Sequence, residues 1–174
     1  MTSSVRSQWV WLRSIFPKVE TLTITDTPLG NGLVVLELYK GVPVFRYVRY
    51  FDGSRSTHVN LLGFVGLTLA HTRRCILTEG VSDFLSVFAH TNSDLFSVVG
   101  RTSLRLSAAH ADMLASLFDE VIIVSDNDPT GLQVFNMHFG LLSERGVRVR
   151  MVVPVRKDIT LDLLNGDMTC LLSI

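Results

Sequence analysis

Two apolar, β-branched stretches of this 174-residue chain, 75–78 and 121–125, end abruptly in acidic residues and glycine. That pattern is typical of buried parallel strands that open into a site at their carboxyl ends. The acids that follow the two stretches are Glu79, Asp83, Asp126 and Asp128. Carboxylate oxygens bind hard divalent cations, so the cluster predicts a site for Mg²⁺ or Mn²⁺. Such a metal site suits phosphoryl or nucleotidyl transfer.

Two of these acids also have structural explanations. Asp128 precedes Pro129, which suits a helix N-cap followed by proline at the first helical position. Asp83 falls in the first turn of an expected helix, where the helix dipole favours an acid. Glu79 ends a buried apolar run, where a carboxylate costs several kcal/mol unless it is paired or metal-bound. A functional role is therefore indicated most strongly for Glu79.

Residues suited to binding phosphate lie beside the acids. Gly80 and Gly100 end two neighbouring strands, where the absence of a Cβ lets the backbone approach a phosphate, although turn glycines give the same pattern. Arg101 follows directly. We expect its guanidinium either to reach a substrate phosphate or to form an ion pair with the acidic cluster.

The chain has no net charge, but its two parts differ. Residues 1–74 hold nine basic residues against four acidic ones, and the remainder carries the opposite excess. We expect Arg46, Arg49 and Arg55 of this basic part to hold a polyanion beside the acidic site, with neighbouring tyrosines stacking on bases. Ordinary solvated surface charge is the alternative interpretation.

Residues 1–74 are predicted to form a small mixed, β-rich lobe, with a helix at 8–16 and antiparallel strands at 21–25, 33–39 and 42–50. Residues 75–174 are predicted to form a second, catalytic domain in which strands and helices alternate. Its expected strands are 75–79, 95–99, 120–125 and 147–154, and its expected helices are 82–91, 107–118, 129–145 and 160–165. This alternation predicts an α/β fold, a mostly parallel sheet flanked by helices.

Within these helices, Ser82 is expected to be an N-cap and Gly146 to end the third helix. Apolar residues at helical spacing in that helix are expected to lie in the core. They are Leu132, Phe135, Phe139 and Leu142. The five histidines show no paired metal-binding spacing and are interpreted as structural or surface residues.

The two acidic motifs together resemble the TOPRIM domain, the catalytic fold shared by DNA primases, type IA and II topoisomerases, OLD-family nucleases and small ribonucleases. Glu79-Gly80 matches the first family signature, with Asp83 where primase-type members place a further acid. Asp126 and Asp128, closed by Gly131, match the Asp-x-Asp-x-x-Gly form of primases. The resemblance covers residues 75 to about 165. It implies a Rossmann-like fold in which Glu79, Asp126 and Asp128 are catalytic and, with Asp83, bind the metal.

The lobe that precedes the acidic motifs resembles that of bacterial and phage DNA primases, notably at 41–53. Lys157 and Asp158 lie where a primase segment has a basic residue and acids, although Asp162 follows at a different spacing. The resemblance implies synthesis of short RNA primers from nucleoside triphosphates on single-stranded DNA, with a replicative helicase as a possible partner. A metal-dependent nuclease and a non-catalytic module that binds nucleic acid or a replication protein remain open.

Other classes of protein fit the sequence poorly. Cys75 and Cys170 lie too far apart for a zinc site, which takes about four Cys or His ligands. No apolar run reaches the roughly 18 residues that span a bilayer, and the start of the chain lacks a signal-peptide core. We therefore expect no zinc, no membrane partner and a cytoplasmic location in a bacterial or phage-infected cell.

Overall fold

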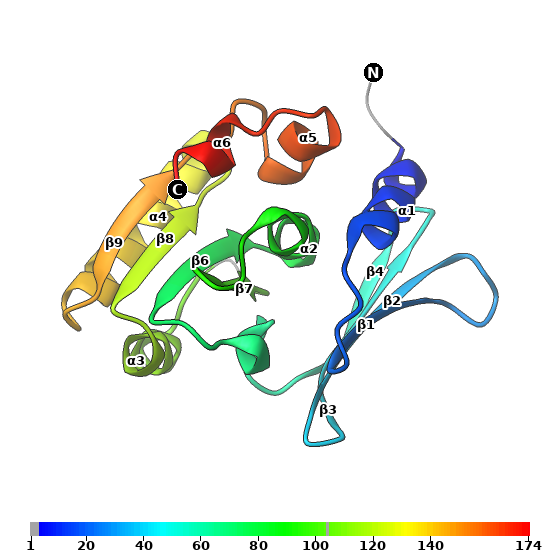
Figure 1. The fold of residues 1–174 in the computed structure, drawn as a ribbon, viewed down its shortest axis with the longest axis horizontal. Helices are drawn as coiled ribbons and strands as arrows, with labels where there is room; N and C mark the ends of the chain where they lie inside the picture. Colours follow the sequence, from blue (N-terminus) through cyan, green and yellow to red (C-terminus); the bar gives the residue numbers. More distant parts are fainter. Residues whose placement is uncertain (1–3, 104) are drawn as a thin grey trace.

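The computed structural model describes residues 4–103 and 105–174. The strands form two sheets that lie side by side (Figure 1). The antiparallel sheet has the order β1, β2, β3, β4, and its strands are β1 (Leu22–Asp26), β2 (Gly32–Tyr39), β3 (Val42–Tyr50) and β4 (Arg55–Asn60). The second sheet has the order β5, β7, β6, β8, β9, and its strands are β5 (Phe64–Val65), β6 (Arg74–Glu79), β7 (Ser97–Arg101), β8 (Glu120–Val124) and β9 (Arg148–Val152).

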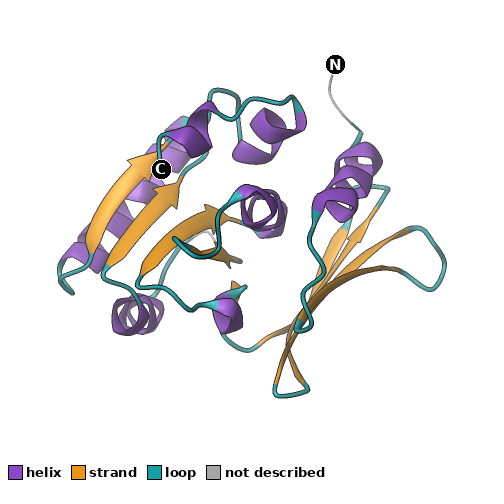
Figure 2. Ribbon diagram, in the orientation of Figure 1, coloured by secondary structure: helices purple, strands orange, loops and turns teal. Residues whose placement is uncertain are grey.

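Helices flank the second sheet, and α1 lies between the lobe and α2 (Figure 2). They are α1 (Val5–Ile15), the 3-10 turn η1 (Leu67–Leu69), α2 (Val81–His90), α3 (Ala108–Leu117), α4 (Pro129–Ser143), α5 (Ile159–Leu164) and α6 (Thr169–Leu172). The predicted α/β fold with a preceding β-rich lobe is confirmed. None of the helices in the described ranges has the length and apolar content that crossing a bilayer requires.

The lobe is a meander of hairpins. β2 and β3 are joined by Lys40 and Gly41, whose φ angles of 50° and 77° are both positive. Two such residues make a tight turn that matches the twist of the flanking strands, and glycine adopts it without steric cost. β4 was not predicted, because most of its residues are exposed and it contains no buried apolar run.

The order of the second sheet creates a crevice at the ends of its central strands. β6 lies between β7 and β8, and all four strands from β6 to β9 run parallel. The chain leaves β6 toward β7 on one side, then crosses back to β8 on the other. The carboxyl ends of β6 and β8 therefore lie at the point where the strand order reverses, which is where open α/β sheets bind ligands.

A single apolar cluster joins the lobe to the second sheet. Trp9 and Leu12 of α1 and Phe45 of β3 belong to the same buried cluster as Phe84 and Leu85 of α2. A separate cluster fills the other face of the sheet, beneath α3 and α4. The lobe thus packs against α2 on one side of the second sheet and shares its core.

Glu37 adds a polar connection between the two parts. This buried β2 carboxylate accepts hydrogen bonds from the backbone N–H groups of Gly66 (2.7 Å) and Thr68 (3.1 Å) and from the Thr68 hydroxyl. Gly66 and Thr68 lie in the segment between β5 and β6, so the lobe strand holds the start of the second sheet.

Several local predictions were wrong. The predicted division at residue 74 places β5 in the lobe, whereas Phe64 and Val65 pair with β7 in the second sheet. Ser82 is not the N-cap of α2, because the helix begins one residue after Gly80. Leu132 and Phe139 of α4 are exposed, at 52% and 44%, and only Leu142 of that predicted set is fully buried.

His138 of α4 has a structural role, as expected. The side chain is buried, and its Nε2 accepts a hydrogen bond from the N–H of Leu106 (3.1 Å). Burial lowers the pKa of His138 to about 4, and the nearby Arg101 charge adds to this shift. The neutral imidazole therefore joins α4 to the segment before α3.

Candidate active site

Two carboxylates meet at the ends of the central strands. Glu79 is the last residue of β6, and Asp126 lies two residues beyond β8, its immediate neighbour. Ser125, directly before Asp126, connects Glu79 to the first turn of α4, because its hydroxyl lies 2.8 Å from the carbonyl oxygen of Gly131 and 3.4 Å from Glu79 Oε1. A Cβ on Gly131 would lie 2.2 Å from the carbonyl oxygen of Asp126, so only glycine fits this position of the motif.

Asp126 lies in a negative environment. Burial raises its pKa from 3.8 to about 6, and the charges of Glu79, Asp158 and Asp128 contribute, against a smaller opposing effect from Lys157. Mutual repulsion among carboxylates is relieved by a bound cation. The cluster is therefore electrostatically suited to a divalent metal.

Asp128 is the N-cap of α4. Its Oδ1 accepts a hydrogen bond from the N–H of Gly131 (2.8 Å), and Pro129 begins the helix. The expected capping role is confirmed, and the second carboxylate oxygen is not needed for it. Capping and metal binding are thus compatible at Asp128.

Asp83 is more deeply buried than the other acids. Thr160 of α5 donates a hydrogen bond to its carboxylate, and the Thr160 hydroxyl also lies 3.1 Å from that of Ser86. Burial raises the pKa of Asp83 well above its usual value, with smaller contributions from Asp158 and Asp126. Asp83 therefore lies near the acidic cluster but is engaged in joining α2 to α5.

Arg101 forms an ion pair with Glu79 across the neighbouring strand ends. Its Nη2 lies 2.7 Å from Glu79 Oε1, and the two side chains are 2% and 15% exposed. Its Nη1 donates to the carbonyl oxygen of Ser103 (2.8 Å). The structure thus favours the ion-pair interpretation of Arg101, because a guanidinium this buried presents little surface to a substrate.

The acidic cluster provides oxygen ligands but no ready-made metal cage. Within residues 4–103 and 105–174, no three His, Cys, Asp or Glu side chains are gathered closely enough to hold an ion by themselves. Mg²⁺ keeps several of its waters and is held by one or two carboxylates together with substrate phosphates. The donor set around Asp126 therefore fits Mg²⁺ better than an ion that requires a complete protein cage.

A cleft of about 700 Å³ lies between the lobe and the second sheet. Glu79, Gly80 and Asp158 line it from the sheet side, and Arg49 and Arg55 line it from the lobe. A smaller recess of about 240 Å³, which includes Asp126, adjoins it at Arg55 and Glu79. The acids and the basic residues thus face a common space.

Arg49 and Arg55 are directly opposite each other on β3 and β4. Like charges in this position destabilise a sheet. Within the described residues, the buried Nε of Arg49 has no hydrogen-bond partner. Asp52, in the connecting turn, accepts hydrogen bonds from Ser54. These bonds lower the pKa of the Asp52 carboxyl, and the positive charge of Arg49 makes a smaller contribution in the same direction. The pair of guanidinium groups is therefore suited to an anion that enters the cleft.

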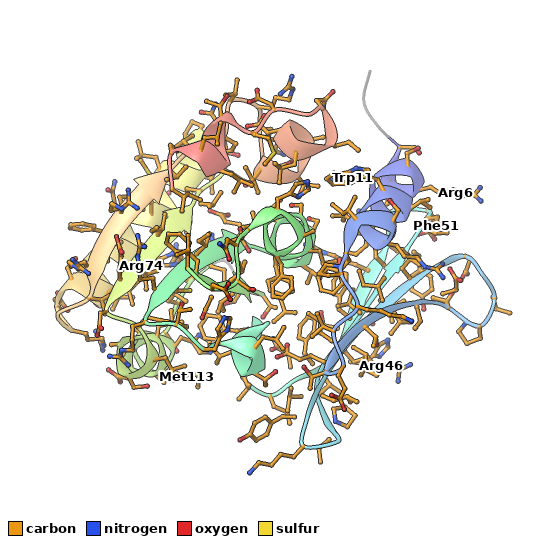
Figure 3. The ribbon with its side chains drawn as sticks, in the orientation of Figure 1. Arg6, Trp11, Arg46, Phe51, Arg74 and Met113 are labelled. Carbon is orange, nitrogen blue, oxygen red and sulfur yellow. The ribbon has the colours of Figure 1, made fainter. Side chains whose placement is uncertain are left out.

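Arg46 does not share this surface. It is exposed on the face of β3 opposite to the buried Phe45 and Tyr47, and it points away from the second sheet (Figure 3). Arg46 lies apart from Arg49 and Arg55 because side chains alternate between the faces of a strand. That all three bind nucleic acid stays a prediction. Only Arg49 and Arg55 line the cleft.

The two predicted phosphate-binding glycines differ. Gly80 lines the cleft with a φ of 91°, and no atom lies within 4 Å of where a Cβ would project. Gly100 is buried, and a Cβ there would lie 2.6 Å from Cβ of Phe84. Gly80 is therefore open to a ligand, whereas Gly100 is required for packing.

The segment after β9 brings Lys157 and Asp158 into the cleft. Asp158 caps α5 by accepting from the N–H of Leu161 (2.8 Å), and burial raises its pKa. Asp162 instead accepts from the N–H groups of Val155 (2.6 Å) and Arg156 (2.9 Å). Asp162, whose spacing differs from that of the primase segment, thus holds the loop that positions Lys157 and Asp158.

Two partners of the acidic residues were not predicted from the sequence. Ser125 and Thr160 are buried polar residues, at 1% and 0% exposure, that bond to site carboxylates. A serine directly before Asp126 was a weak signal for the first. Nothing in the sequence pairs Thr160 with Asp83, because the two lie on different helices.

Solved primase structures share this fold. The primase fragment of the bacteriophage T7 primase-helicase has a TM-score of 0.65 and 20% identity, over 87% of this chain and 66% of that one. The Aquifex aeolicus primase, with its zinc-binding and RNA polymerase domains, has a TM-score of 0.65 and 19% identity, over 88% and 43%. A DnaG primase catalytic domain bound to single-stranded DNA has a TM-score of 0.60 and 15% identity, over 79% and 49%.

The chain thus spans about two thirds or less of each of these proteins. A search of curated proteins finds no match. The family model described as Toprim-like matches residues 76–163, just over half of the chain, and includes Glu79, Asp126 and Asp128. Motif, fold and family model agree, and the chain belongs to the Toprim-like family.

Proposed function

We propose that this chain is a primase-type catalytic core that uses Mg²⁺ or Mn²⁺ to join nucleoside triphosphates into short RNA primers on single-stranded DNA. The observation that carries the proposal is the cleft between lobe and sheet, where Arg49 and Arg55 face Glu79 and Asp158. A polyanion held on the basic wall would lie beside the acids. The chain also shares its fold with a primase domain bound to single-stranded DNA, which supports the same proposal.

Asp126 is the proposed centre of metal binding, with Glu79 and Asp128 as its neighbours. A bound divalent cation would neutralise charge on the reacting phosphate and orient the attacking hydroxyl. Asp128 holds its carboxylate at the start of α4 through the hydrogen bond to Gly131. Ser125 and Arg101 hold Glu79 from the other side.

Arg49, Arg55 and Lys157 are the proposed contacts for phosphates of the template or nucleotide. All three line the cleft. Arginine binds phosphate through two parallel hydrogen bonds, whereas lysine provides a point charge. A replicative helicase or another replication protein in the cytoplasm is the kind of partner that we propose for such a core.

The test is incubation of the protein with single-stranded DNA, labelled nucleotides and Mg²⁺ or Mn²⁺, with the products separated by length. Primer synthesis predicts new short products, and Asp126→Asn should abolish them. Shortened DNA would identify a metal-dependent nuclease instead. Neither product, across both metals and several templates, would contradict catalysis and leave a binding module.

Glu79→Gln separates two proposed roles of Glu79, metal ligand and proton acceptor for the attacking hydroxyl. A ligand role predicts weaker Mn²⁺ binding by calorimetry, whereas a base role predicts slow primer synthesis at saturating metal with near-normal Mn²⁺ affinity. We favour the ligand role. Because Arg101 would lose its charged partner, a melting curve must accompany both measurements. Normal affinity and normal synthesis together would contradict both roles.

A further inference from the structure

The outer edge of the second sheet is open. β9 is its last strand, and in the described ranges no strand pairs with its outer side (Figure 1). On the inner side, the N–H of Arg148 donates to Asp119 (3.0 Å) and the carbonyl of Val152 accepts from Ser125 (3.1 Å). Alternate residues of a parallel strand bond to the same neighbour, so the residues between them present their peptide groups outward. These outward residues are Val149, Met151 and Val153.

An apolar groove of about 490 Å³ runs beside this edge. Pro129 and Leu132 of α4 line one wall, Met151 and Val153 line the other, and the acidic loop of Asp126, Asn127 and Asp128 completes the lining. Leu132 is 52% exposed, and Met151 and Val153 are 36% and 39% exposed. Phe139, about two helical turns further along α4, continues the exposed stripe. Leu132 and Phe139 are thus the two α4 side chains whose helical spacing predicts a core position but which lack a covering layer.

The opposite face of the same edge is basic. Arg148 and Arg150 alternate with the groove residues along β9, so their side chains lie on the other face of the sheet. Arg148 is exposed, whereas Arg150 forms an ion pair with Glu120 (3.2 Å) and donates a hydrogen bond to the carbonyl oxygen of Ile174 (3.1 Å). A segment pairing with this edge would therefore meet apolar side chains on one face and positive charge on the other.

These observations specify the chemistry of an occupant. Outward peptide groups are satisfied by another extended backbone, whereas a helix has no free groups along its length to pair with them. A second copy pairing through its own β9 around the two-fold axis would bring arginines of both copies together, which is unfavourable. An extended segment with alternating apolar and acidic residues avoids that conflict.

We propose that the open edge of β9 binds an extended segment of a partner protein as an additional strand. Its apolar side chains occupy the groove between β9 and α4, and its acidic side chains face Arg148 and Arg150. This proposal does not depend on nucleotidyl transfer. It assigns a docking function to a groove outside the cleft between lobe and sheet, and this groove borders the acidic site at Asp126 and Asp128.

The test uses a fluorescent six-residue peptide that alternates valine and glutamate, with binding followed by anisotropy. We expect Leu132→Glu to weaken binding at least about tenfold, because it places a charge in the groove. Arg148→Glu should weaken it by about threefold to tenfold and reduce its salt dependence. Leu29→Glu, at a residue 86% exposed in the lobe, is the matched control and should bind normally.

Two further measurements identify the mode of binding. A peptide of the same composition in blocks, with three valines followed by three glutamates, should bind poorly because it cannot present two distinct faces. Hydrogen exchange at Val149, Met151 and Val153 should slow when the alternating peptide is added. Absence of binding, unchanged affinity in Leu132→Glu, or no protection at these amides would overturn the proposal. A dimer abolished by Leu132→Glu would show instead that a second copy occupies the edge.

Discussion

At the scale of single residues, the acidic site combines two kinds of carboxylate. Asp128 has a structural role, because its carboxylate caps the N-terminus of α4. Asp126 accepts no such bond in the described structure, and burial with neighbouring acids raises its pKa to about 6. The two residues of the Asp-x-Asp motif should therefore respond oppositely to substitution in metal-free protein.

Asp126→Asn is expected to abolish primer synthesis and to stabilise the metal-free protein at pH 7 to 8. Because the folded protein holds a proton on Asp126 up to about pH 6 and the unfolded chain only to about 3.8, ionisation lowers stability as pH rises through this window. We expect a gain on the order of 1 to 2 kcal/mol, since part of the carboxyl faces solvent. Denaturant unfolding should show this gain vanishing near pH 4. A loss at pH 7 to 8 would contradict the electrostatic interpretation.

Asp128→Ala is expected to destabilise the metal-free protein by about 1 kcal/mol, because α4 loses its N-cap. Asp128→Asn keeps a capping oxygen and should unfold close to wild type while still losing metal affinity. Unfolding curves and Mn²⁺ titration of the pair separate the capping role from the metal role. Equal stability of Asp128→Ala and wild type would show that the cap contributes little.

The site was predicted from the sequence in part. Glu79 and Asp126 stand out because a charged residue directly after a buried strand needs a partner or a ligand. The Arg101 partner could not be chosen from the sequence, because phosphate binding and ion pairing require the same residue type. The link between Asp83 and Thr160 depends on how α2 and α5 pack, which no local pattern records.

At the scale of elements, the position of a side chain on its strand decides its role. β3 carries both Arg46 and Arg49, yet only Arg49 lines the cleft. Charge counting along the sequence groups these residues, whereas the alternation of a strand separates them.

Arg49→Gln combined with Arg55→Gln is expected to weaken binding of single-stranded DNA. If each arginine contacts one phosphate, the slope of log affinity against log salt should fall by about 1.4 in total. Arg46→Gln, on the outer face of the same strand, is the matched control and should leave the slope unchanged. An equal effect of Arg46→Gln would contradict this prediction, because it would mean that the DNA contacts the outer face of the sheet.

The parallel strands of the second sheet and the helices between them were predicted well, because turn residues separate them and β6, β7 and β8 carry buried runs. β4 and β5 were not, since β4 is largely exposed and β5 has only two residues. The α4 stripe shows the opposite error. Leu132 and Phe139 recur at core spacing, but periodicity reports only that a face is apolar and does not identify what covers it.

At the scale of the whole molecule, lobe and sheet should unfold together. Trp9 and Phe45 share a buried cluster with Phe84 and Leu85, so neither part retains its core when the other unfolds. A fragment that begins at the predicted boundary of residue 75 would expose this cluster and lose β5.

Glu37→Gln is expected to lower the stability of the whole protein by about 1 to 3 kcal/mol, because a buried charge-assisted hydrogen bond is lost. The loss should appear as one shifted unfolding transition, without a second step. Fluorescence and circular dichroism of denaturant-treated protein measure this, with Glu20→Gln on the exposed surface as control. Two separate transitions in the variant would show that the lobe folds independently.

The Glu37 connection also bears on how long the cleft would hold a template under the proposed function. Because the carboxylate ties β2 to the segment that enters the sheet, and one apolar core lies behind both walls, we expect the cleft to keep a nearly constant width. A cleft that does not close around single-stranded DNA would retain it mainly through electrostatic attraction. Residence time, and with it the number of nucleotides added before release, should then shorten as ionic strength rises, so that processivity is set by the solution as much as by the protein.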